Sequence, residues 1–151
     1  LLACGKRGKM HESILVLDAI PHDIQVALLL LGLDSENVKY NADSTQVIDG
    51  DNIEISVLWN DGKKKVSASE LFKNIETGKP PEAKWVFIGS KVIDGLFVAD
   101  QEESIIATYH DEYSIIDFAA TGADNDELFV INKDLVPPIG TAVEVILKAT
   151  L

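Results

Sequence analysis

Cysteine and basic segments are scarce in this chain of 151 residues, and long apolar runs are absent. The single cysteine, Cys4, cannot by itself form a disulfide, a zinc cluster or an iron–sulfur site. The formal net charge is −12, and the only sizeable basic cluster is at residues 63–65. Nucleic-acid binding needs a face that neutralises phosphates, so we expect no nucleic-acid partner. The longest apolar run, residues 24–31 around Gln25, is too short to span a bilayer.

The signatures of common enzyme classes are missing as well. His11 and Glu12 are followed by Ser13, so the HExxH pattern of zinc hydrolases is not formed, and no G-x-S-x-G elbow exists. Gly5 and Gly8 suggest a phosphate loop, but only two residues separate them. We interpret residues 5–9 as a positively charged turn that can bind an anion. The sequence therefore predicts no catalytic residue, no metal site and no cofactor.

The composition is that of one globular domain covering residues 1–151. Apolar residues make up 46% of the chain and charged residues 25%, which excludes a disordered protein. The chain starts Leu-Leu-Ala-Cys-Gly without a methionine. This start is similar to the end of a bacterial lipoprotein signal, but we favour an incoming strand. We expect the chain to be a fragment of a longer precursor, with a signal peptide or another domain upstream.

Hydrophobic patterning predicts an α+β domain with a mixed or mainly antiparallel sheet and two main helices. One helix begins at Pro21, is buried on most sides and ends at Gly32; the other begins with a capping box at Ser67 and Glu70 and ends near Gly78. A third, short helix is expected at residues 114–119. Strands are expected at residues 12–19, 53–59, 64–66, 85–88, 96–99, 104–109, 128–132 and 142–149, with a two-residue hairpin turn at Asp61-Gly62. The first half follows the order of a split βαβ unit.

The candidate site lies where the strand over residues 12–19 begins. That strand is apolar on both faces, so we expect it to be central in the sheet. Its polar start and the end of the strand over residues 104–109 can meet through strand pairing. The candidate polar or binding cluster consists of Lys9, His11, Glu12, Ser13, His110 and Asp111.

Two roles for this cluster stay open. In the first, Glu12 pairs with Lys6, Arg7 or Lys9 and anchors the fold as a polar cluster. In the second, the same residues bind a ligand. A metal-dependent enzyme using His11 and Glu12 with His110 or Asp111 is a further alternative.

Four stretches carry a resemblance to a known family. They are LLACGKRGKMHESILVLDAIPHDIQVALLLLGL (1–33), WVFIGS (85–90), FVAD (97–100) and VPPIGTAVEV (136–145). Together they resemble the YdjY-like domain, a bacterial family whose function is not settled. The resemblance implies an exported or lipid-anchored domain of the periplasm or cell envelope. Some members carry iron–sulfur motifs, but a chain with only Cys4 can take a redox role only as another protein's partner.

These observations predict a non-catalytic, extracytoplasmic binding or assembly domain that has a protein partner and acts near residues 5–12. The two alternatives are the metal-dependent enzyme and a structural subunit of an envelope or electron-transfer complex. The sequence does not specify the oligomeric state.

Overall fold

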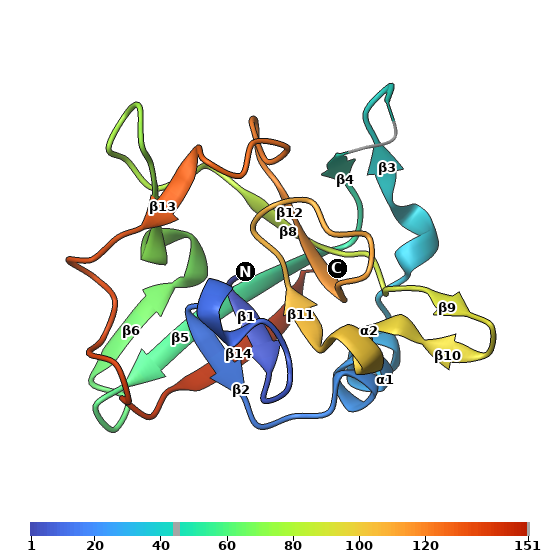
Figure 1. Ribbon diagram of the computed structural model, residues 1–151, viewed down its shortest axis with the longest axis horizontal. Helices are drawn as coiled ribbons and strands as arrows, with labels where there is room; N and C mark the ends of the chain where they lie inside the picture. Colours follow the sequence, from blue (N-terminus) through green and yellow to red (C-terminus); the bar gives the residue numbers. More distant parts are fainter. Residues whose placement is uncertain (44–45, 151) are drawn as a thin grey trace.

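The computed structural model describes residues 1–43 and 46–150, and a curled eight-stranded sheet forms its centre (Figure 1). The strand order is β14-β5-β8-β12-β11-β1-β2, and β6 also pairs with β5. Neighbouring strands are antiparallel except for the pairs β1–β2 and β11–β12. The sheet strands are β1 (Ala3–Gly5), β2 (Leu15–Leu17), β5 (Asn52–Trp59), β6 (Lys64–Ser67), β8 (Lys84–Phe87), β11 (Ser104–Ile106), β12 (Ile116–Ala119) and β14 (Glu144–Thr150).

Short ribbons and helices surround this sheet. The ribbons pair β3 (Lys39–Tyr40) with β4 (Val47–Asp49), β7 (Phe72–Asn74) with β13 (Phe129–Ile131), and β9 (Val92–Ile93) with β10 (Leu96–Phe97). Two α-helices lie in the described part of the chain, α1 (Pro21–Leu30) and α2 (Val98–Glu102). The 3₁₀ turns are η1 (Met10–Glu12), η2 (Ser35–Asn37) and η3 (Ala68–Leu71). The predicted α+β class with a mixed, mostly antiparallel sheet is therefore confirmed.

The sheet buries side chains on both of its faces. The main core collects apolar residues from most strands together with α1 and η3, including Leu15, Leu28, Ile53, Leu71, Trp85, Phe87, Ile116 and Phe118. A smaller core on the other face consists of Val47, Val86 and Ile88. Asp117 pairs with Val86 across β12 and β8, so its side chain lies on the face of the smaller core. This position buries a carboxyl group beneath the β3–β4 ribbon.

Several local predictions are wrong, for tertiary reasons. β2 is the edge strand of the sheet and not a central one, and Val16 is exposed. Four strands separate β2 from β5, so the first half forms no split βαβ unit. α1 begins at Pro21 as predicted, and Gly32 has the positive φ of a helix cap, but most of the helix surface is exposed.

The predicted helices after α1 are also misplaced. The capping box of Ser67 and Glu70 forms, yet it opens only the single turn η3 before β7 begins. Residues 116–119 form β12, because the sheet offers β8 and β11 as partners. Residues 98–102 form α2, although a strand was expected at residues 96–99. No helix in the described ranges has the length and apolar character that a membrane span requires.

The hairpin between β5 and β6 has a longer loop than predicted. Trp59 pairs with Lys64, which leaves four loop residues in place of two. Asp61 and Gly62 have the expected positive φ values of 54° and 75°, and Asn60 shares this conformation. A Cβ atom on Gly62 would meet nothing within 4 Å, so only the backbone conformation restricts this position.

We expect Gly62→Val to lower the free energy of unfolding by about 1–2 kcal/mol, because a β-branched residue is strained at positive φ. Gly62→Asn is the matched control, since asparagine tolerates this conformation and should cost less. Urea denaturation of both variants measures the difference. Equal stability of the valine and asparagine variants would contradict this account of the loop.

Candidate functional site

The turn of residues 5–9 binds an anion, and the anion is the chain's own Glu103. The backbone N–H of Arg7 donates to Glu103 Oε2 at 2.5 Å, and Arg7 Nε donates to Oε1 at 2.8 Å. Gly5 N–H donates to the backbone oxygen of Glu103 at 2.9 Å. The carboxylate is thus held by the main chain and the guanidinium of a single turn.

Two glycines permit this close approach. A Cβ atom on Gly5 would lie 2.4 Å from Glu103 Oε2, and one on Gly8 would lie 2.9 Å from the Glu103 backbone oxygen. Either contact is shorter than side chains tolerate. Glu103 itself has a left-handed backbone, with a φ of 49°, at the junction between α2 and β11. The Gly-x-x-Gly spacing is therefore explained by packing against Glu103.

The charge of Glu103 is stabilised within this turn. Burial by itself would raise the pKa of the carboxyl group. The hydrogen bonds from the Arg7 backbone and side chain, together with the Arg7 charge, outweigh burial and lower the pKa of Glu103 below its usual value. The group is consequently ionised at neutral pH and acts as a fixed negative charge at the base of β11.

In the described structure Glu12 forms no ion pair with Lys6, Arg7 or Lys9, the pairing on which the anchoring role depends. Arg7 pairs with Glu103, and Lys6 pairs with Asp18 at 2.9 Å. The carboxylate of Glu12 lies 3.2 Å from His11 Nε2, and the two side chains are 56% and 78% exposed. An anchoring carboxylate does meet the turn, but it comes from position 103, which lies 96 residues beyond Arg7.

The structure brings four of the six candidate site residues to one cavity. Lys9, Glu12, His110 and Asp111 line a hollow of about 610 Å³. His11 and Ser13 do not line it, and the Ser13 hydroxyl donates to the Lys9 carbonyl at 2.9 Å. No group of three His, Cys, Asp or Glu side chains in the described residues is placed to hold a metal ion.

Asp111 accepts hydrogen bonds from residues close to it in the sequence. Its Oδ2 accepts from the Ser104 hydroxyl at 2.6 Å, and its Oδ1 accepts from the Tyr113 N–H at 3.0 Å. The Asp111 backbone oxygen also accepts from the Ser114 hydroxyl at 2.9 Å. These bonds close the turn between β11 and β12 and set the position of His110.

His110 is paired with the fully buried carboxyl group of Asp117, which the sequence did not single out. His110 Nδ1 lies 2.5 Å from Asp117 Oδ2, and Asp117 Oδ1 accepts from the Phe118 N–H at 2.8 Å. The Tyr40 ring packs edge-on against the imidazole, with 6.1 Å between ring centroids. An imidazole oriented by a buried carboxylate can hold or transfer a proton.

The pair retains a proton more strongly than either group does in water. The hydrogen bond to Asp117 raises the pKa of His110 above its usual value, and partial burial opposes this shift. The nearby charges of Asp117, Asp111 and Glu112 act in the same direction as the hydrogen bond. Burial raises the pKa of Asp117, against the bonds from His110 and Phe118. We treat the two groups as one unit that binds a proton tightly.

We expect Glu103→Gln to lower the free energy of unfolding by about 1–3 kcal/mol, since an amide replaces one of the acceptor oxygens that face Arg7. Glu12→Gln is the matched control and should change stability by less than about 0.5 kcal/mol, because its pairing is exposed. Thermal or urea melts at neutral pH measure both. If Glu12→Gln lost more stability than Glu103→Gln, then Glu12 and not Glu103 would be the carboxylate that anchors the turn.

The His110–Asp117 pair predicts a pH-dependent contribution to stability. The folded pKa of His110 is raised, so its protonation stabilises the fold fully below the unfolded value of about 6.5. This contribution is lost as pH rises through the raised pKa. The stability advantage of wild type over His110→Gln should therefore be larger at pH 6 than at pH 9 (~3 pH units apart).

Exposed His11 provides the control for that measurement. His11→Gln should follow wild type across the same range to within about 0.5 kcal/mol. A stability advantage of wild type over His110→Gln that grew with rising pH would mean that folding lowers the pKa of His110. That result would contradict this account of its pairing with Asp117.

Comparison with known proteins identifies the family. The model of the YdjY domain matches residues 1–148. No curated protein matches the chain, and no solved structure matches it. The match covers almost all of the 151 residues and includes the Gly5–Gly8 turn, β2 and α1. The chain therefore belongs to the YdjY domain family.

Proposed function

We propose that this YdjY domain is a non-catalytic binding or assembly domain that acts outside the bacterial cytoplasm through a protein partner. The observation that carries the proposal is an exposed apolar surface on α1 and the β9–β10 ribbon. The extracytoplasmic location rests on the family resemblance. A role as a structural subunit of an envelope complex is one form of the same proposal.

The apolar surface consists of side chains that the core does not use. On α1, Leu30 is 83% exposed, and on β9, Val92 is 68% exposed. We define the surface by the exposed residues Val26, Leu29, Leu30, Leu31, Val92, Ile93 and Leu96. Grouped apolar side chains on a folded domain typically mark a surface that another molecule covers.

Three observations place these elements next to one another. Figure 1 shows α1, α2 and the β9–β10 ribbon gathered on one side of the sheet. The backbone N–H of His22 in α1 donates to Asp100 Oδ1 in α2 at 2.8 Å. The His22 ring packs against Phe97 of β10, with 5.9 Å between centroids. α1, α2 and the β9–β10 ribbon thus contact one another and form one surface, which we call the platform.

Charge indicates what kind of partner fits. The chain carries a net charge of −12, so a second copy would be repelled. Acidic residues on the platform include Asp23 in α1, Asp94 in the β9–β10 turn and Glu102 in α2. A different protein with an apolar patch bordered by basic side chains suits this surface best.

The metal-dependent enzyme has less support. His11 and Glu12 pair with each other at the exposed surface, and they come from consecutive positions. Asp111 is engaged by Ser104 and Tyr113, and His110 by Asp117. The candidate metal ligands are thus each paired or hydrogen-bonded to other protein groups.

Leu30→Glu tests the assembly proposal in the full-length protein in its own bacterium. Gently solubilised envelope fractions are separated by size, and the position of the domain is followed. We expect wild type to elute in a complex with one defined partner and Leu30→Glu to bind that partner at least about tenfold more weakly. The domain itself should keep its stability, because Leu30 is exposed.

Ile139→Glu is the matched control, since Ile139 is an equally apolar, fully exposed residue on the loop before β14. It should leave the complex intact. Elution of wild type as a monomer, or an unchanged complex with Leu30→Glu, would contradict the proposal. Recovery of the full-length protein in the cytosolic fraction would contradict the location separately.

A further inference from the structure

The sheet contains a gap along one edge of β5. β14 pairs with the other edge throughout its length. On the gapped edge, β8 pairs with Asn52 and Ile53, and β6 pairs with residues from Ser56 to Trp59. Glu54 and Ile55 lie between these two segments and have no strand partner on that edge. A cavity of about 650 Å³ opens at this point.

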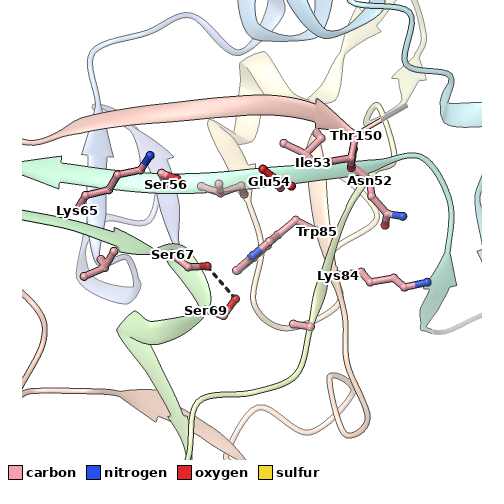
Figure 2. Close-up of a pocket in the computed structure, with 13 residues that line it drawn as sticks. Asn52, Ile53, Glu54, Ser56, Lys65, Ser67, Ser69, Lys84, Trp85 and Thr150 are labelled. Atoms are coloured by element: carbon pink, nitrogen blue, oxygen red, sulfur yellow. Dashed lines mark hydrogen bonds between the residues drawn. The ribbon is translucent and has the colours of Figure 1, made fainter.

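A buried hydrogen-bond donor faces this cavity without a partner. Trp85 lines it and is only 4% exposed, and its Nε1 is the one buried side-chain donor in the described residues that makes no hydrogen bond. Figure 2 shows the Trp85 side chain extending from β8 toward Ser67 and Ser69. A buried donor without an acceptor costs about 1–3 kcal/mol, so an acceptor placed here would stabilise the protein.

The groups that line the cavity are suited to an anion. The hydroxyls of Ser67 and Ser69 are hydrogen-bonded to each other at 3.5 Å, so one of the two keeps its proton for another acceptor. Lys65 also lines the cavity and has no ion-pair partner among the described residues. The other charges there are already balanced, since Lys84 pairs with Asp49 and Glu54 with Lys148.

The remaining polar group of interest, Asn52 Oδ1, is an unpartnered acceptor at the far end of the cavity. Figure 2 shows the Asn52 side chain pointing away from Trp85. Apolar side chains, including Ile55, Val66 and Ala83, complete the lining near the indole. The cavity therefore combines hydrogen-bond donors and apolar surface near Trp85 with one free cation, Lys65, elsewhere in its lining.

We propose that this cavity binds a small organic carboxylate. One carboxylate oxygen accepts from Trp85 Nε1, the free hydroxyl proton of the Ser67–Ser69 pair donates to the other, and Lys65 balances the charge from elsewhere in the same lining. The apolar part of the ligand lies against Ile55 and Val66. This site is separate from the apolar surface on α1 and β9–β10, and its ligand is independent of the protein partner.

The chain has two tryptophans, so the indole N–H signals in an NMR spectrum report on the site directly. Titration with sodium acetate should shift the Trp85 signal in a saturable manner and leave the Trp59 signal in place. Trp59→Phe and Trp85→Phe assign the two signals. Acetamide, which is neutral and of the same size, should bind about tenfold more weakly or not at all.

Two lysines of the same hairpin supply matched variants. Lys65→Gln should weaken acetate binding about tenfold, whereas Lys63→Gln should leave it unchanged. Both side chains are exposed, so neither variant should unfold. A Trp85 signal that does not saturate, that acetamide shifts equally, or that responds identically in both lysine variants would overturn the proposal.

Discussion

The hydrogen bonds between the Gly5–Gly8 turn and Glu103 connect segments that lie 96 residues apart in sequence. The carboxylate is bound by Arg7 through both main chain and side chain, while the Glu103 carbonyl accepts from Gly5. These bonds align β1 with β11, the strand that Glu103 introduces. One junction thereby orients the first strand, α2 and the second half of the sheet.

The same junction supports the helical platform. α2 ends at Glu102, directly before Glu103, and Asp100 within α2 accepts from the His22 N–H near the start of α1. This bond supplies an acceptor to a helix end whose N-cap residue, Ile20, cannot provide one. Because α2 covers the first turn of α1, the later residues of α1 remain open. The apolar surface thus follows from how α1 is anchored.

Some polar side chains of the domain hold the fold together, and others are available to bind a ligand. Glu103, Asp111 and Asp117 each accept at least two hydrogen bonds, so their charges and positions serve the fold. Lys65 and the indole N–H of Trp85 have no such partners in the described structure, and both line the gap beside β5. The contrast separates side chains that build this YdjY domain from those that can meet a ligand.

Local pattern alone determined the class of the domain, the start of α1 at Pro21, the capping box at Ser67, and the strands β5, β8 and β14, because each depends on periodicity or on neighbours in the chain. It also indicated that residues 5–9 form a positively charged turn that can bind an anion. Only the tertiary structure decided that the anion is Glu103, that Asp117 orients His110, and that β2 lies at an edge. These outcomes depend on pairing between distant segments, and one strand's sequence does not specify its neighbours in a sheet.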